Sequence, residues 1–341
     1  MRNIDELIGR IRETVESHRL ESPGQYCRWL WQNEQKPRKL GINEYGCADA
    51  ANILYTINDF VEVPSEREQW IRTLKSMQNP KTGLFTEATH HTIHTTAHCV
   101  AALELFDAKV DYPLTALSQY STPEGIRRFL DELDWAGEPW LASHQGAGIY
   151  AAMKLTDSAG IDWERAYFDW FYENQDPATG LWRKGCVKEG SAPLFAHIGG
   201  SFHYLFNIEY AKRPIRYANQ MVDTCIELYE SKQMGDKIST HDCDLFGKYV
   251  GFLEMDWVYM ISRASRRNGY RHEDCKRVIR GFAREYIDWL YSLDYKTHDS
   301  FNDLHKLFGT CCALAEIQQY LIGEYETTKP LRLVLDRRPF I

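Results

Sequence analysis

The sequence predicts an all-α protein: a single (α/α)6 toroid, in which six helical hairpins close into a ring. Three observations predict this fold. Helix-period hydrophobic patterns run through most of the 341 residues, whereas the strict alternation of a strand is nearly absent. Amphipathic segments alternate with segments that are apolar on all sides. One short turn sequence also occurs twice, at an interval that fits two hairpins.

The first kind of segment is charged on one face and apolar on the other. We expect these six segments to form the outer layer of the ring, because each has one face suited to water. They are Ile4–Glu16, Ser65–Met77, Pro123–Leu133, Asp162–Asn174, Ile215–Ser231 and His272–Leu293.

The second kind carries small and apolar residues on nearly all sides. A helix of this composition is buried all round, so these segments predict an inner ring. They are Tyr45–Phe60, His94–Phe106, Gln145–Leu155, Gly199–Tyr210, Met255–Ala264 and Asp303–Leu321.

The length fits one domain. Six hairpins with their loops need roughly 40 to 60 residues each, and 341 residues supply this. We therefore predict one domain over residues 1–341, with residues 322–341 as a C-terminal extension that packs on the ring.

Composition limits the class of protein and its partners. The chain is 44% hydrophobic, has a net charge of -8, and contains neither a basic stripe for nucleic acid nor an apolar run of the roughly 18 residues that a membrane span needs. The nine cysteines are scattered and odd in number, which argues against a disulfide framework. We expect a cytoplasmic protein whose partner is a small molecule or an oligosaccharide.

The repeated turn reads Gln-Asn-Pro-Lys-Thr-Gly-Leu-Phe from Gln78 and Gln-Asp-Pro-Ala-Thr-Gly-Leu-Trp from Gln175. The stretch Leu74–Phe106, which includes His94-Thr-Thr-Ala-His98, resembles the repeat of terpenoid cyclases and protein prenyltransferases. The turn itself is similar to turns of six-hairpin glycosidases and of related lyases and epimerases. All these families are α/α toroids, so the resemblance implies the ring fold and leaves the reaction open.

Inner helices of such a ring run in the same direction, so their first turns and the loops before them meet at one mouth. Eight of the twelve histidines fall at the predicted starts of inner helices. Histidine exchanges protons near neutral pH, and clustered titratable groups in a pocket are typical of enzymes. The competing explanation is that these histidines cap helices or bond to loop carbonyl groups. The eight are His90, His91, His94, His98, His144, His197, His203 and His305.

The candidate catalytic residues are carboxylates and one histidine. Asp256 lies among aromatic residues at a helix start, where burial would raise its pKa toward that of a general acid, although a first-turn aspartate that caps the helix is an equal reading. Asp303 or Asp49 would be its partner, and His144 would act beside them. The candidate substrate-binding residues are Tyr45, His94, His98, Gln145, His197, His203, Glu254, Trp257 and His305.

No metal or cofactor is expected. His94 and His98 have the i, i+4 spacing of metal ligands, but the glutamate of the zinc-protease motif is missing between them. The segment His241-Asp-Cys-Asp244 has the residue types that hold zinc in prenyltransferases, yet the rest of that motif does not align.

Three functions remain open at this point. The first is a carbohydrate-active enzyme: a glycoside hydrolase, lyase or sugar epimerase that uses acid/base residues in the pocket. The second is a relative of terpenoid cyclases or prenyltransferases, although the Asp-x-Asp-Asp motif of the class II cyclases is absent. The third is a toroid that binds a ligand without catalysis.

Overall fold

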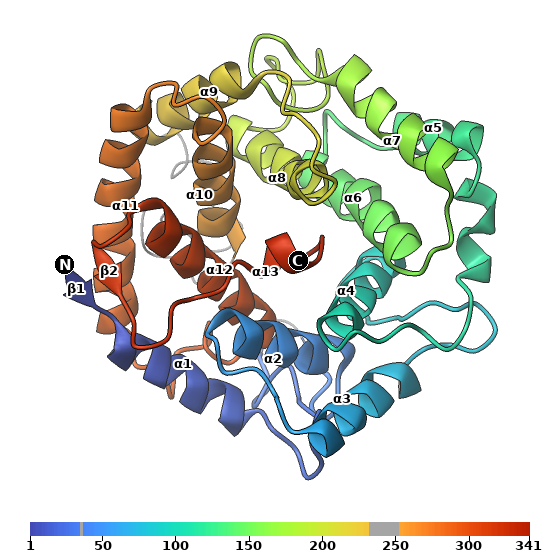
Figure 1. Ribbon diagram of the computed structural model, residues 1–341, viewed down its shortest axis with the longest axis vertical. Coiled ribbons are helices and arrows are strands. Elements are labelled where there is room, and N and C mark those ends of the chain that lie inside the picture. Colours follow the sequence, from blue (N-terminus) through green and yellow to red (C-terminus); the bar gives the residue numbers. More distant parts are fainter. Residues whose placement is uncertain (35–36, 232–251) are drawn as a thin grey trace.

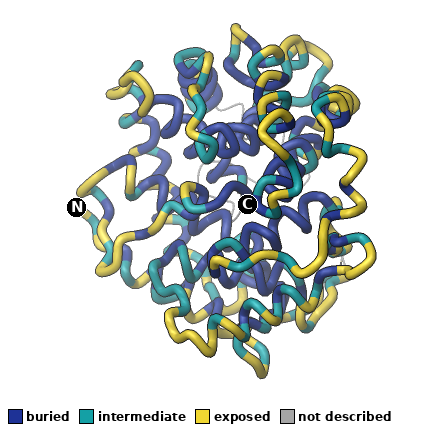
Figure 2. Tube along the Cα trace, turned by 45° about the vertical axis from the view of Figure 1, so that its right-hand side comes forward, coloured by how far each residue is buried: buried dark blue, intermediate teal, exposed yellow. Residues whose placement is uncertain are grey.

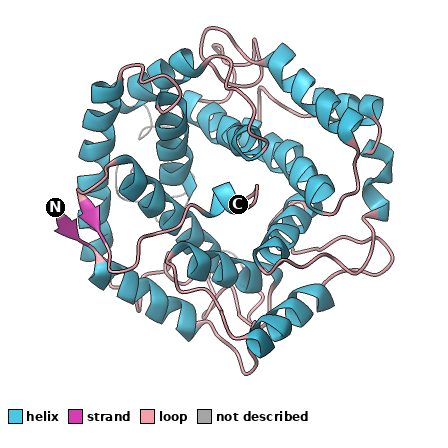
Figure 3. Ribbon diagram, in the orientation of Figure 1, coloured by secondary structure: helices cyan, strands magenta, loops and turns pink. Residues whose placement is uncertain are grey.

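The computed structural model describes residues 1–34, 37–231 and 252–341, and the chain is all-α over them (Figures 1 and 3). Each of the twelve segments expected to be helical overlaps one long helix. These helices are α1 (Asp5–Ser17), α2 (Glu44–Thr56), α3 (Pro64–Ser76), α4 (Thr92–Leu105), α5 (Pro123–Glu132), α6 (Pro139–Leu155), α7 (Ile161–Asn174), α8 (Leu194–Tyr210), α9 (Ala218–Ser231), α10 (Phe252–Ser265), α11 (His272–Ser292) and α12 (Leu304–Tyr320).

Four short elements complete the description. A 3-10 helix (Thr115–Tyr120) precedes α5, and α13 (Val334–Arg337) lies near the end of the chain. The two-residue strands β1 (Arg2–Asn3) and β2 (Tyr325–Glu326) pair in parallel, with Arg2 opposite Tyr325. None of the described helices is long and apolar enough to cross a membrane. The eight cysteines in the described part of the chain are all free thiols.

The helices form two layers around a centre (Figure 1). Each even-numbered helix from α2 to α12 packs against the even-numbered helices before and after it, and α12 returns to pack against α2. The odd-numbered helices α1 to α11 lie outside this inner layer, and the exposed parts of the trace are on the outside in Figure 2. The burial of single helices follows: α4 is buried along nearly its whole length, whereas α3 buries only Trp70 and Leu74.

Glycines allow the inner helices to approach closely. A Cβ atom on Gly200 of α8 would lie 2.7 Å from the backbone oxygen of Pro139 in α6. Such a contact is too short for any side chain, so the close packing of α6 against α8 depends on glycine here.

The repeated turn has the same structure in both places. The Gln78 amide donates to the backbone oxygen of Gly83 at 2.8 Å, and the Gln175 amide donates to that of Gly180 at the same distance. Both glycines have φ of 75°, a conformation that favours glycine. After each turn, the backbone N–H of a buried aromatic residue donates to a hydroxyl group of the next inner helix: Phe85 N–H donates to Thr96 Oγ1 and Trp182 N–H to Ser201 Oγ.

Two inner helices begin earlier than predicted. α6 begins at Pro139 rather than near Gln145, and α8 begins at Leu194 rather than near Gly199. Proline suits the first turn of a helix because it has no N–H group to satisfy, and the glycines that follow are contact points rather than helix breaks. His144 therefore lies in the second turn of α6, and His203 lies in the third turn of α8.

The chain after α12 first runs along the outside and then enters the ring. Residues 325–326 pair with β1, and the segment with α13 runs to the centre of the ring, where Figure 1 places the C-terminal label. Phe340 and Ile341 are completely buried there.

Candidate functional site

A cavity of about 770 Å³ opens at the N-terminal ends of the inner helices. Its wall combines imidazoles with large apolar side chains, among them Trp140, Phe195 and Phe252. This size and mixture suit a small ligand that has both polar and apolar parts. The histidines in the wall are His90, His91, His94, His144, His203 and His305.

Asp49 lies behind this wall and holds two histidines. His98 Nε2 donates to the Asp49 carboxylate at 2.7 Å, and His305 Nδ1 donates to its two oxygens at 3.1 and 3.2 Å. Asp49 is inaccessible to solvent. Burial alone would raise its pKa, but His305 and His98 outweigh burial and hold the pKa of Asp49 well below its usual value. Asp49 is therefore an ionised carboxylate that only accepts hydrogen bonds.

The acceptor role of Asp49 fixes the tautomer of His305. Because an ionised carboxylate has no proton to give, the proton of this hydrogen bond must be on His305 Nδ1. Burial lowers the pKa of His305, so the ring is neutral near pH 7. Its Nε2 atom then carries a lone pair, and His305 is part of the cavity wall. An aspartate that orients a neutral histidine in this way prepares it to accept a proton.

His203 has the same tautomer for a different reason. Its Nδ1 lies 2.9 Å from the backbone oxygen of Gly199 and 3.1 Å from Ser143 Oγ. The carbonyl can only accept, so Nδ1 carries the proton and Nε2 is again the basic nitrogen. Burial lowers the pKa of His203 to about 4.

Tyr45, a residue of α2, contacts three further histidines of the cluster. Its hydroxyl lies 2.5 Å from His94 Nδ1, and its ring stacks on those of His90 and His98, with centroids 4.5 and 5.0 Å away. His144 lies next to His94, with ring centroids 4.5 Å apart. Burial, followed by repulsion from neighbouring histidines, holds the pKa values of His94 and His144 far below 6.5.

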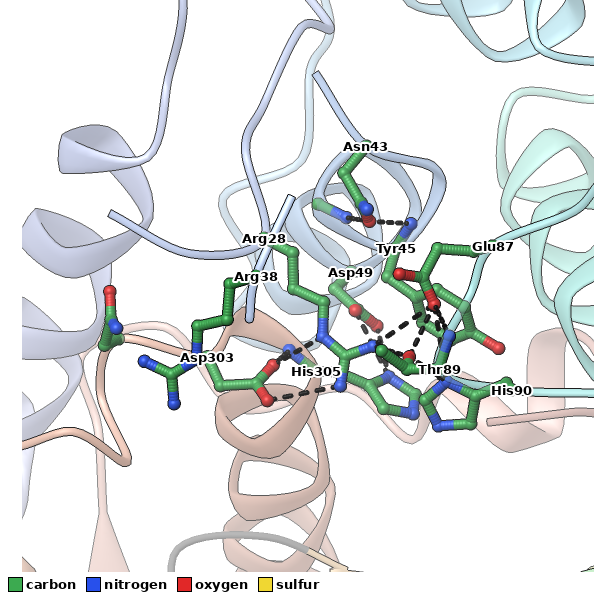
Figure 4. A network of polar contacts seen from close by, with 12 residues as sticks. Arg28, Arg38, Asn43, Tyr45, Asp49, Glu87, Thr89, His90, Asp303 and His305 are labelled. Carbon is green, nitrogen blue, oxygen red and sulfur yellow. Dashed lines mark hydrogen bonds and ion pairs between the residues drawn. The ribbon is translucent and has the colours of Figure 1, made fainter. Parts of the chain in front are cut away.

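Arg28 brings a positive charge to the edge of the cavity. Its guanidinium group donates to both oxygens of Asp303, at 2.8 and 3.2 Å, and to Thr89 Oγ1 at 2.8 Å (Figure 4). It also lies 5.0 Å from the centre of the Tyr45 ring. Burial would raise the pKa of Asp303, but Arg28 outweighs this effect and lowers the pKa to about 2. Asp303 is thus committed to an ion pair, and it also caps α12 through the backbone N–H of His305.

The predicted site residues fall into three groups. Five are part of the cavity wall: His94, His144, Gln145, His203 and His305. Four lie behind the wall and contact it: Tyr45, Asp49, His98 and Asp303. Four others lie elsewhere: His197, Glu254, Asp256 and Trp257.

The last group is turned away from the cavity for identifiable reasons. Trp257 donates to the backbone oxygen of Cys225 at 3.0 Å and packs on Tyr229 and Phe282, so it faces the outer helices. His197 contacts the loop before α8, where its Nε2 lies 3.4 Å from Ser191 Oγ. Trp257 therefore packs between the helix layers and His197 against this loop, and neither is among the described wall residues.

Asp256 is buried between α10 and α8. A Cβ atom on Gly199 would lie 2.8 Å from its Oδ2, so glycine makes the room that this carboxyl group occupies. Neither of its oxygens has a hydrogen-bond partner within the described part of the chain. Burial, followed by repulsion from Glu254, raises the pKa of Asp256 well above its usual value. Glu254 is buried in the same helix.

Asp49, His98 and His305 have the residue types of a metal site. Their ligand atoms lie within 4.8 Å of one another, and they form the one such group among the described residues. An ion bound by His98 Nε2 would shift the ring proton to Nδ1, which is buried and has no hydrogen-bond partner among residues 1–34, 37–231 and 252–341. Metal-binding histidines almost always donate this second proton to a partner. The geometry therefore fits a hydrogen-bonded carboxylate better than a metal. The segment His241–Asp244 lies outside the described residues.

Sequence reasoning missed several residues of the cavity wall. Phe195 is in the first turn of α8, which was predicted to begin later. Arg28 comes from the irregular segment between α1 and α2, and no periodic signal marks it. Ile341 reaches the cavity from the opposite end of the chain.

Comparison with known proteins adds no relative to this description. No family model, no curated protein and no solved structure matches the chain.

Proposed function

We propose that the chain is an (α/α)6 toroid enzyme that transfers protons on a carbohydrate, as a lyase or a sugar epimerase does. The closed cycle of contacts among α2, α4, α6, α8, α10 and α12 supports the toroid. One observation carries the function: His305 is part of the cavity wall while the buried carboxylate of Asp49 holds its Nδ1–H.

The reaction would start at His305 Nε2. This atom takes the proton from a carbon next to a carboxylate or carbonyl group of the substrate, and Asp49 stabilises the imidazolium that forms. His144 is the partner on the other side, because it comes from α6, which α2 and α4 separate from α12 in the inner ring. In an epimerase, His144 takes a proton from solvent on one ring nitrogen while it gives the proton on the other to the opposite face of the substrate, so the ring ends neutral. In a lyase, the imidazolium of His305 gives the proton that it has taken to the leaving oxygen. A positioned acid or base of this kind typically contributes about 10²- to 10⁴-fold in rate.

Hydrolysis by two carboxylates has less support. That mechanism needs two carboxyl groups on either side of the sugar bond, roughly 5 to 9.5 Å apart. Asp303 is paired with Arg28, Asp49 lies behind His305, and Asp256 lies against Gly199. None of the three is part of the cavity wall. Glu138 has the one side-chain carboxylate among the described wall residues.

The isoprenoid alternative is favoured by a different observation. Trp140, Phe195 and Phe252 give the wall three aromatic faces, which would stabilise a carbocation as well as they stack on a sugar. Six imidazoles in the same wall are a poor lining for an isoprenoid chain, because the chain would leave them without water or a partner. We therefore place this function second.

The test follows protons rather than a chosen product. The protein is incubated in D₂O with a panel of uronic acids, oligouronates and aldo or keto sugars, and also with farnesyl diphosphate. NMR reports the exchange of carbon-bound protons, and ultraviolet absorbance reports a new double bond. We expect the wild type to turn over a sugar, and we expect His305→Gln to lower the turnover rate by about 100-fold or more.

His272→Gln is the matched control, because His272 lies at the start of outer helix α11, away from the cavity. It should keep wild-type turnover. Turnover on farnesyl diphosphate alone would favour the isoprenoid function. A wild-type protein that binds sugars and exchanges no proton on any of them would overturn catalysis in favour of binding.

A further inference from the structure

The segment that contains α13 is held firmly at the C-terminal ends of the inner helices. The Arg332 backbone N–H donates to the Thr56 oxygen at the end of α2, at 2.8 Å. The Arg337 guanidinium donates to the side chain and the backbone oxygen of Glu104 at the end of α4, at 3.1 and 2.8 Å. Arg263 of α10 forms an ion pair with Asp336 at 2.6 Å. Three inner helices therefore fix this segment at the end of the ring opposite the mouth.

From these anchors the chain continues toward the cavity. Arg338 is completely buried, donates to Asn52 Oδ1, and lies 5.5 Å from the centre of the Phe308 ring. Asn52 belongs to α2 and Phe308 to α12. A buried arginine held in this way fixes the backbone of the residues that follow it. Moving the arginine would break its hydrogen bond and leave a buried charge without a partner.

Phe340 then packs against the inside of the histidine cluster. Its ring meets the His94 ring edge-on, with centroids 4.8 Å apart, and meets the Phe206 ring at 5.9 Å. A Cβ atom on Gly148 would lie only 3.3 Å from the Phe340 ring, so the glycine leaves the space that the ring fills. Gly148 follows His144 by four residues, which is one helical turn, or about 6 Å, deeper in the ring.

Ile341 is part of the cavity wall, and the residue as a whole is 1% exposed. It comes from the segment anchored at the far end, whereas the histidines of the wall come from helix starts at the mouth. We propose that residues 338–341 form the floor of the cavity and set how deep a ligand can enter, with Ile341 as the size-determining residue. The ligand that fits has an apolar inner end against Ile341 and polar groups about one helical turn nearer the mouth, at the histidines.

This assignment does not depend on the reaction at His305. Its first test is the accessibility of a cysteine at position 341. Small methanethiosulfonate reagents are added to Ile341→Cys and to Val334→Cys, and mass spectrometry follows the labelling, with the wild type as the background for the native cysteines. Val334 is equally buried in the same segment but is not part of the cavity wall.

We expect the cysteine at 341 to react at least about tenfold faster than the one at 334, because only the first faces the cavity. A His144→Trp substitution in the Ile341→Cys protein should slow the reaction, since it narrows the path from the mouth. Equal rates at 341 and 334 would overturn the proposal, and so would a rate at 341 that His144→Trp leaves unchanged.

A second variant tests the depth directly and does not need a cysteine. Straight-chain carboxylates from butanoate to dodecanoate are titrated by calorimetry into the wild type, Ile341→Ala and Val334→Ala. In each protein, affinity should rise with the length of the carboxylate up to a limit. This limit should be about two carbons longer in Ile341→Ala than in the other two proteins, because the substitution removes three carbons from the floor. The same limit in all three proteins would overturn the proposal.

Discussion

Replacing Asp49 with asparagine tests the hydrogen bonds that organise the histidine cluster. The substitution keeps the size of the side chain and removes the charge that His98 and His305 bond to. A hydrogen bond to a charged group contributes about 1.5–3 kcal/mol and a neutral one about 0.5–1.5 kcal/mol. Two bonds that change from charged to neutral therefore lose about 2 kcal/mol together.

A second loss follows from the chemistry of asparagine. Its amide has one oxygen to accept with, and its NH₂ group would meet the N–H of one histidine. That arrangement leaves a buried donor without a partner, at about 1–3 kcal/mol. The sum predicts that Asp49→Asn lowers the free energy of unfolding by about 3–5 kcal/mol.

Urea unfolding followed by circular dichroism measures this difference. The control is Asp299→Asn, because Asp299 also forms a two-bond ion pair, with Arg38, but is 45% exposed. We expect its loss to be at most about 1 kcal/mol. An Asp49→Asn protein no less stable than Asp299→Asn would refute the role given to the buried carboxylate.

Three further predictions concern stability. His98 and His203 have pKa values lowered to about 4, so between about pH 6.5 and pH 4 the unfolded chain binds more protons than the folded one. The free energy of unfolding, measured with urea at a series of pH values, should fall over this range by roughly 3 kcal/mol for each histidine at pH 4. A free energy of unfolding that does not change with pH would contradict their burial as neutral rings. Tyr45→Phe removes the partner of His94 and should lower stability by about 1–3 kcal/mol, and an unchanged urea midpoint would argue against this bond. Gln78→Ala removes four bonds to loop backbone and should lower the melting temperature, with a loss of about 2–4 kcal/mol; a loss under 1 kcal/mol would show that water replaces the amide.

The helices and their two layers could be predicted because their signals are local. A stripe of apolar residues marks an outer helix wherever it occurs, and an all-round apolar segment such as α4 marks an inner one. The repeated turn could be predicted as well, since Gln78 and Gln175 each donate to the backbone oxygen of the glycine five residues later. The pairing of β1 with β2 was not predicted, because two residues are too few to show alternation.

The candidate site was predicted only in part. Helix starts located six of the eight expected histidines in the cavity wall. The direction of each side chain could not be derived from an all-round apolar helix, so Trp257 was expected at the cavity and faces the outer layer instead. Asp49 and His305 are far apart in the chain, and so are Ile341 and the histidines above it. Their contacts follow from the three-dimensional structure and have no local signal in the sequence.

The central claim is that His305 is a neutral histidine with its proton on Nδ1 and its lone pair on Nε2. Long-range ¹H–¹⁵N NMR of the histidine rings, with His305→Gln used to assign the signal, measures this tautomer directly. At pH 7 we predict a protonated Nδ1 and an unprotonated Nε2 for His305, and in Asp49→Asn a mixture of the two tautomers. A proton on Nε2, or a fully protonated ring at that pH, would contradict the role of His305 as the base.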